Sequence, residues 1–201
     1  MVTDETPEQS AGTAPVPRSP GRGQRRFAAA ALAVVVVFFC AATARLFVFP
    51  ARGMPARVDA IVMLGGRGDR YGEALRLAYQ HRAPNLVISL GSSFGQGQPS
   101  DLGAGCAPPM PRVKVICFAP VPATTQGEAE YVGHLAAQRH WRSIVLVTIT
   151  PQDSRARLRF ERCYGGGVYV MTGSLHAYGW PYEIAYEWAA TIKALAFQRS
   201  C

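Results

Sequence analysis

Arginines of regular spacing and one glutamate follow the apolar runs of this chain, and such groups could bind an anion and move a proton. Arg155, Arg159 and Arg162 are spaced i, i+4, i+7 and therefore share one stripe of a predicted helix. The planar fork of arginine suits phosphate or carboxylate. A cation near a helix N-terminus opposes the helix dipole. Arg155 therefore needs a compensating charge, either a bound anion or an internal acid such as Glu128 or Glu187.

Glu128 itself has two interpretations. It follows Thr125 in a Thr-x-x-Glu pattern, which is the signature of a helix capping box. In that role the threonine side chain accepts from the helix backbone and the glutamate reaches back, which explains both residues structurally. Alternatively, Glu128 faces a cleft as a general acid or base. On this pattern alone, capping is favoured.

Glycines and hydroxyl side chains end two other apolar runs. Gly65 and Gly66 close the first, with Arg70 at the start of the next helix, and Ser89 and Gly91 close the second. Glycine lets a ligand approach the backbone, and a helix N-terminus favours an anion. Taken singly, these residues are explained as well by ordinary turns. The spacing is not G-x-G-x-x-G, so no dinucleotide fingerprint is present.

The elements that position these residues alternate in type along the chain. Helices are expected at 69–83, 125–140, 153–164 and 181–198, and strands at 58–64, 85–90, 113–119, 143–149 and 167–171. This alternation predicts an α/β, Rossmann-like three-layer domain with a mostly parallel sheet of about five strands. Ligands of such sheets bind outside the carboxyl ends of the strands, which is where the polar residues lie.

A membrane anchor is predicted ahead of this domain. The uncharged stretch 27–44 is long enough to cross a bilayer. Arginines before it indicate a cytoplasmic N-terminus and an extracytoplasmic domain at the plasma membrane. Secretion after cleavage near Ala44 is the alternative. The predicted parts are a disordered tail at 1–26, a transmembrane anchor at 27–49, a linker at 50–57 and the α/β domain at 58–201.

The cysteines fit an exported domain. Cys40 lies in the apolar stretch, and the four others allow three pairings. Cys106–Cys117 would pin a loop to the following strand, and Cys163–Cys201 would tie a helix end to the last residue. An oxidising compartment makes both plausible, with four unpaired thiols as the alternative.

Several classes of function are disfavoured by the sequence. The net charge is +8, but no basic stripe is interleaved with aromatic residues, so nucleic-acid binding is not expected. The cysteines lack Cys-x-x-Cys spacing and the four histidines are scattered, so no metal site is expected. No cofactor is expected either, and the oligomeric state is left open.

The motifs together resemble a known family. "DAIVMLGG…R", "VISLG", "TTQGEA" and "VLVTITPQDSRA" occur in this order across residues 58–197. The set resembles the YdcF-like family, a domain of unknown function shared with the envelope proteins SanA and ElyC. The resemblance implies a Rossmann-like domain, often behind one membrane anchor. It also implies a cleft lined by Gly65, Gly66, Arg70, Ser89, Gly91, Thr125, Glu128, Thr148 and Arg155.

One position departs from the family pattern. Gln152 stands where the family commonly has a histidine, and glutamine can form hydrogen bonds but cannot shuttle protons. A general base would then have to be Glu128. His176, in a later loop, could reach the cleft, although a surface position is the simpler interpretation.

The resemblance leads to an expected role in cell-envelope biogenesis. The expected ligand is an anionic precursor, phosphorylated or carboxylated, such as a lipid-linked saccharide. One hypothesis is a hydrolase or transferase in which Arg155 stabilises charge and Glu128 is the base. The second is a non-catalytic membrane assembly or binding factor, which the missing histidine favours. A nucleotide-type ligand is a weaker third, because such molecules are scarce outside the cell.

Overall fold

The computed structural model describes residues 21–50, 53–91 and 105–201. The chain divides into two compact units, Met1–Cys40 and Ala41–Cys201. An apolar helix, α1 (Arg22–Thr43), continues as the short π-helix η1 (Ala44–Val48). By length and composition this segment could cross a membrane.

The tail prediction needs one correction. Residues 1–20 lie outside the described residues, but Arg22–Arg26, predicted to be disordered, form the first turns of α1. The physical reason is that these residues continue directly into a strongly apolar helical run, so helix formation propagates back from it.

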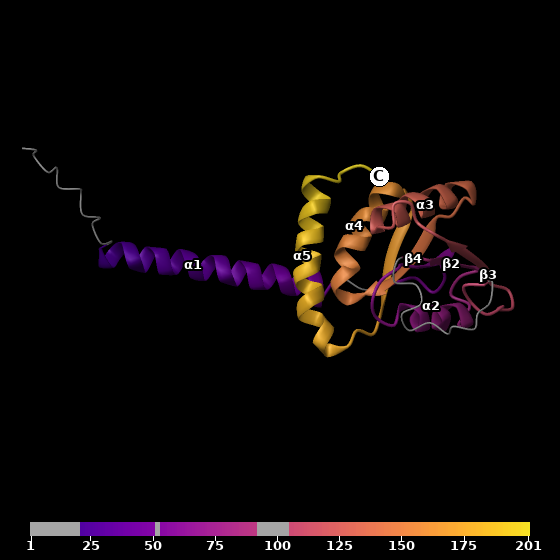
Figure 1. Cartoon of the computed structure of the whole chain (residues 1–201), viewed down its shortest axis with the longest axis horizontal. Helices are drawn as coiled ribbons and strands as arrows, with labels where there is room; N and C mark the ends of the chain where they lie inside the picture. The colour runs from indigo at the N-terminus through magenta and orange to yellow at the C-terminus, as the bar shows by residue number, and fades with distance from the viewer. Residues whose placement is uncertain (1–20, 51–52, 92–104) are drawn as a thin grey trace, which may run out of the picture. The chain divides into compact units, whose positions relative to one another are not determined.

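A five-stranded parallel sheet forms the centre of the second unit (Figure 1). The order is β3-β2-β1-β4-β5, so the chain crosses from one side of β1 to the other between β3 and β4. In register, Val62 of β1 lies between Val87 and Leu146. The predicted α/β class is confirmed. The strands are β1 (Ala60–Met63), β2 (Asn85–Ser89), β3 (Lys114–Phe118), β4 (Ser143–Ile149) and β5 (Gly167–Gly173).

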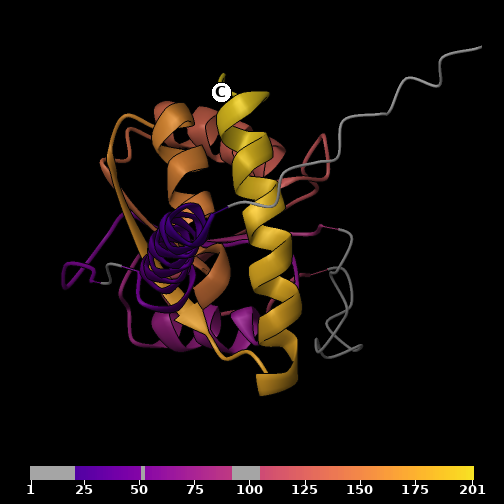
Figure 2. The ribbon, with the colours of Figure 1, turned by 90° about the vertical axis from the view of Figure 1, so that its left-hand side faces the viewer.

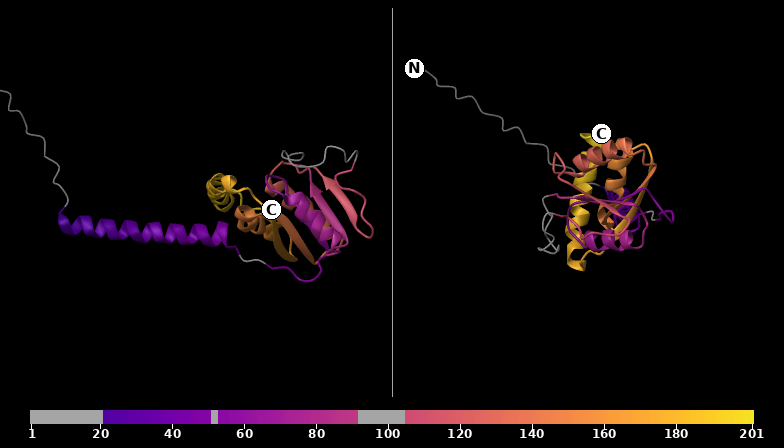
Figure 3. Two further views of the ribbon diagram at one scale, coloured as in Figure 1. Left: turned by 90° about the horizontal axis from the view of Figure 1, so that it is seen from below. Right: turned by 90° about the vertical axis from the view of Figure 1, so that its right-hand side faces the viewer.

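Helices cover both faces of this sheet. Alternate strand residues point to opposite faces: Ile61 packs with the apolar side of α2, and Val62 with that of α3 and α4. The last helix, α5, packs outside α4 (Figures 2 and 3). The bounds are α2 (Arg70–Tyr79), α3 (Thr125–Gln138), α4 (Asp153–Cys163) and α5 (Trp180–Ala196), with a 3-10 turn η2 (Thr150–Gln152) before α4.

Two disulfides close the fold. Cys106 is bonded to Cys117, and Cys163 to Cys201, which is the one of the three allowed pairings whose bonds the sequence analysis described. Cys40 is free and exposed. The disulfides and the apolar helix are compatible with a membrane-anchored, extracytoplasmic domain.

The end of the apolar segment is packed into the domain. Phe47 is fully buried and meets Trp188 of α5 edge-to-face, with ring centroids 5.2 Å apart. The Trp188 indole also donates to the Thr43 hydroxyl at 3.1 Å, and Ser154 Oγ donates to the Leu46 carbonyl at 2.7 Å. The compact unit therefore begins at Ala41, whereas the sequence placed an anchor and linker as far as residue 57.

Candidate functional site

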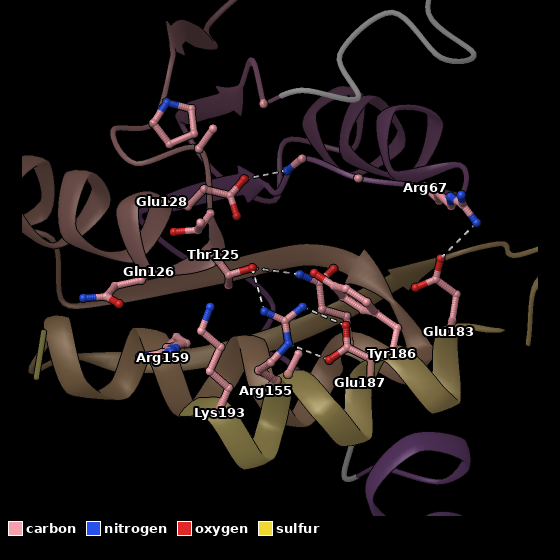
Figure 4. A pocket seen from close by; sticks show the side chains of 18 of the residues that line it. Arg67, Thr125, Gln126, Glu128, Arg155, Arg159, Glu183, Tyr186, Glu187 and Lys193 are labelled. Atoms are coloured by element: carbon pink, nitrogen blue, oxygen red, sulfur yellow. Dashed lines mark hydrogen bonds and ion pairs between the residues drawn. The ribbon is translucent and has the colours of Figure 1, made fainter. Parts of the chain in front are cut away.

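A cavity of about 360 Å³ lies at the carboxyl ends of the strands (Figure 4). Its walls come from the turn after β1, the end of β2, the segment that opens α3, the start of α4, and one side of α5. The lining residues are Gly65, Gly66, Arg67, Arg70, Gly91, Pro120, Ala123, Thr124, Thr125, Gln126, Glu128, Gln152, Arg155, Arg159, Tyr182, Glu183, Tyr186, Glu187, Ala190, Lys193 and Gln198.

Most of the predicted site residues meet at this cavity, but two do not line it. Ser89 and Thr148 are fully buried beneath it. With both residues fully buried, their side chains are not accessible to a ligand in this structure. Thr148 instead donates to Gln152 Oε1 at 2.7 Å and orients that side chain. The predicted residues that do line the cavity are Gly65, Gly66, Arg70, Gly91, Thr125, Glu128, Gln152 and Arg155.

Arg155 has an internal counter-charge. Its Nε and Nη2 donate to the two carboxylate oxygens of Glu187 at 2.6 and 2.7 Å, and its Nη1 donates to Thr125 Oγ1 at 3.0 Å. Burial disfavours the charged guanidinium, but the Glu187 carboxylate, with smaller contributions from Tyr186 and Glu128, raises the pKa of Arg155 overall. Of the two predicted alternatives, the structure shows the internal acid.

The capping-box prediction is wrong by one residue. Thr124 is extended and caps α3, its Oγ1 accepting from the Gly127 N–H at 3.3 Å. Thr125 is already helical, so its hydroxyl is available to Gln152 and Arg155. The Glu128 carboxylate does not reach back to its own helix; its Oε1 accepts from the Gly65 N–H at 2.7 Å (Figure 4). Both residues therefore belong to the cavity rather than to a cap.

α4 begins at Asp153, where the predicted helix 153–164 begins, and Gln152 holds its N-cap position without a side-chain cap hydrogen bond. The 3-10 turn η2 precedes it and carries the chain into helical geometry before Asp153. The Ser154 hydroxyl, in the first turn of α4, donates to the Leu46 carbonyl.

Glu128 is a buried acid with a perturbed proton affinity. It is only 3% exposed, and burial raises its pKa. The Ser89 hydroxyl, the Gly65 N–H and the charges of Arg70 and Arg155 oppose this effect without cancelling it. Ser89 acts at close range but makes no hydrogen bond of regular geometry among the described residues.

The raised pKa of Glu128 gives a testable pH dependence. The Glu128 carboxyl binds its proton more tightly in the folded protein than in the unfolded chain. The protonated carboxyl therefore contributes stability that is fully present below the unfolded-state pKa and is lost as the pH rises through the folded-state pKa. We expect the unfolding free energy of wild type, minus that of Glu128→Gln, to fall as the pH rises above about 4, the pKa of a glutamate in the unfolded chain. Denaturant titrations across this range measure it. Glu161→Gln, on the exposed face of α4, is the control; an equal slope for both variants would contradict the assignment.

Arg70 is a buried cation held by carbonyl groups alone. It is 5% exposed, and its Nε donates to the Arg67 carbonyl at 2.7 Å while Nη1 donates to the Leu64 and Gly65 carbonyls. Burial lowers its pKa to about 10 in spite of the nearby glutamates, so it stays charged at neutral pH. Within the described residues, Nη2 has no hydrogen-bond partner and no carboxylate lies at ion-pair distance.

Other basic side chains add to this charge. Arg159 is 4% exposed and donates to the backbone and side-chain oxygens of Gln198, which are neutral. Lys193 extends from α5 along the same wall (Figure 4). The lining has five basic residues (67, 70, 155, 159, 193) and three acidic ones (128, 183, 187), a formal balance of +2. The cavity is therefore positive overall.

Two glycines allow close approach at the end of β1. A side chain on Gly65 would begin 3.3 Å from both Glu128 Oε1 and the Gly91 Cα. Gly66 has φ +130°, and a Cβ there would point into the Arg70 guanidinium. These two glycines therefore keep Glu128 and Arg70 in place.

The sequence analysis named Glu187 as a candidate partner of Arg155 but did not predict that α5 forms a wall of the cavity. Glu183 and Tyr186 line the cavity, and Glu183 lies 3.9 Å from Arg67, which stacks over Tyr182 at 4.6 Å. One signal was available: Glu183 and Glu187 are spaced i, i+4 on a helix that is otherwise almost apolar. His176 does not line the cavity and is exposed. No cluster of three metal-binding side chains occurs in the described ranges.

Comparisons of this chain with protein-family models, with curated proteins and with solved structures find no match.

Proposed function

We propose that this domain binds the phosphate or carboxylate group of a cell-envelope precursor, such as a lipid-linked saccharide. The observation that carries the proposal is Arg70, a buried guanidinium with no ion-pair partner in the described part of the chain. Leaving a charge buried and unpaired is costly, and a bound anion would remove that cost. Arg155 is already neutralised by Glu187. We therefore assign the main contact with the anion to Arg70 and not to Arg155.

The surrounding charges support the same ligand class. Arg159 and Lys193 also line the cavity and are not ion-paired in the described residues. Tyr182 and Tyr186 line it as well, with their rings next to Arg67 and Arg155. Basic groups together with aromatic rings suit a molecule with an anionic head and a sugar body.

The cellular setting follows from the resemblance to the YdcF-like family and from the apolar helix. We propose a single-pass protein of the plasma membrane with a cytoplasmic N-terminus and its α/β domain outside. Thr43 and Phe47 both contact Trp188. These contacts favour retention of the helix over cleavage near Ala44, because cleavage would discard the Thr43 contact.

Two observations bear on catalysis, and they point in different directions. Burial raises the pKa of Glu128, which suits a general base at neutral pH. The Gln152 amide, however, is held by two hydrogen bonds: its oxygen accepts from the Thr148 hydroxyl and its nitrogen donates to the Thr125 hydroxyl. Gln152 therefore has a structural role in the cavity lining, and its amide cannot transfer protons. A non-catalytic binding factor is therefore the second candidate.

Binding is tested on the full chain in nanodiscs with Arg70→Met. Inorganic phosphate, pyrophosphate and sugar phosphates are titrated, and thermal stabilisation is recorded. We expect Arg70→Met to weaken phosphate binding at least about tenfold, since hydrogen bonds to charged groups contribute about 1.5–3 kcal/mol. Arg76→Met, on the exposed side of the same helix and paired with Glu73, is the matched control. Equal affinity in wild type and Arg70→Met would overturn the proposal.

The same ligands, assayed for turnover, separate the two candidates. In an enzyme, Glu128→Gln retains binding and loses turnover. A wild-type protein that binds but never turns over the ligand is a binding factor.

A further inference from the structure

The outer face of α5 has an unusual composition for a helix at a protein surface. Its two acids, Glu183 and Glu187, are buried against the cavity. Lys193 is then the one charged residue on its exposed side. The exposed residues of this segment, here called the α5 outer face, are otherwise apolar or aromatic: Pro181, Tyr182, Ala185, Tyr186, Ala189, Ile192, Leu195, Ala196 and Phe197.

This composition is unusual for a helix face that contacts only water. A helix covering a soluble domain normally turns charged residues outward. Here Ile192 is 55% exposed and Phe197 is 82% exposed, and a contiguous apolar patch of this kind marks a contact surface.

The position of the end of the apolar segment indicates what the α5 outer face contacts. Thr43, the last residue of α1, bonds to Trp188 of α5, and Phe47 packs against the same ring. If α1 spans a bilayer, its end lies at the lipid–water interface. The domain helix attached to that end is α5, so α5 lies at the interface as well.

We propose that the α5 outer face rests on the membrane, with its apolar side chains in the outer part of the lipid layer. Tyrosine and tryptophan suit this depth because they combine an apolar ring with a polar atom. Lys193 suits the headgroups of anionic lipids. Glu183 and Glu187, which a membrane surface would disfavour, point away into the cavity.

The inference also specifies where the ligand comes from, and this part rests on the proposed function. Tyr182, Tyr186 and Lys193 belong both to the outer face and to the cavity lining. An anionic headgroup in the lipid layer next to α5 therefore reaches Arg70 without leaving the membrane surface. The ligand is the headgroup of a membrane-resident lipid.

Site-directed spin labelling of the full chain tests the placement. The free cysteine is removed with Cys40→Ala, and a nitroxide is attached at Ala185→Cys, Ala189→Cys or, as a control, Ala137→Cys on the exposed side of α3. The protein is reconstituted in phosphatidylcholine–phosphatidylglycerol nanodiscs with no ligand added. Collisions with oxygen, which concentrates in lipid, are compared with collisions with a water-soluble nickel chelate.

The proposal expects a high oxygen-to-nickel ratio at 185 and 189, and a low ratio at 137. Low ratios at all three positions overturn it. The proposal is also overturned if labels at 185 and 189 are protected from both reagents. In that case, dipolar broadening that disappears on dilution with unlabelled protein would show that a second copy of this chain covers the α5 outer face. The readout is the depth of labels on the α5 outer face, at positions that do not line the cavity, so it does not measure binding in the cavity. Failure of the proposed function shows separately, as unchanged phosphate affinity in Arg70→Met.

Discussion

Replacing Glu187 with alanine is expected to destabilise the domain by about 3–5 kcal/mol, because it leaves a buried guanidinium without its counter-charge. The Glu187 side chain is 1% exposed and that of Arg155 is 9% exposed, so water does not replace the lost carboxylate. Chemical denaturation of the full chain in mild detergent, followed by circular dichroism, measures the change.

Two controls test whether the loss of stability comes from the Arg155 guanidinium that is left without its counter-charge. Glu183→Ala removes a longer contact, 3.9 Å, to an Arg67 side chain that is 58% exposed, and exposed pairs contribute about 0–1 kcal/mol. The double variant Glu187→Leu with Arg155→Met removes both charges and is expected to recover most of the loss. If Glu187→Ala costs no more than Glu183→Ala, the structural role assigned to this pair is wrong.

The second large effect is expected at Phe47. Phe47→Ala removes a fully buried ring that packs on Trp188, and such truncations typically cost about 3–5 kcal/mol. The loss should appear in α5 first, as faster hydrogen exchange of its amides, because Trp188 loses its packing partner.

Phe49 provides a matched control for Phe47 two residues away. Its side chain is 71% exposed, and exposed substitutions usually stay within about 0.5 kcal/mol. Comparable destabilisation by Phe47→Ala and Phe49→Ala would mean that the end of the apolar helix is not part of the folded domain.

The fold was largely predictable because its three central strands, β2, β1 and β4, are buried on both faces. Such strands appear as uninterrupted apolar runs, and the run at 143–149 coincides with β4. The run at 58–64 was too long, since β1 covers Ala60–Met63. Val58 and Leu64 are equally buried, but they lie beyond the strand pairing. Apolar character marks burial, not the ends of a hydrogen-bond ladder.

The site was less predictable, since it depends on contacts that sequence spacing does not encode. The strand-end residues were found because parallel strands bring their carboxyl ends together. The partner of Arg155 comes from α5, 32 residues further on, and no local pattern selects it over Glu128. Thr124 caps α3 because its backbone is extended, whereas Thr125 is already helical. The sequence has threonine at both positions and does not show which of them is the cap.

The position of Glu187 in the last helix has a consequence for the order in which the protein becomes functional. Synthesis proceeds from the N-terminus, so the Gly65–Arg70 turn and Arg155 emerge before their wall and counter-charge. Until α5 has been made and docked, the nascent chain exposes the side of α4 that α5 covers and an uncompensated arginine. One docking event then neutralises Arg155, completes the cavity and joins the domain to the end of its apolar helix. A truncated chain lacking α5 would lose all three at once and be open to proteolysis.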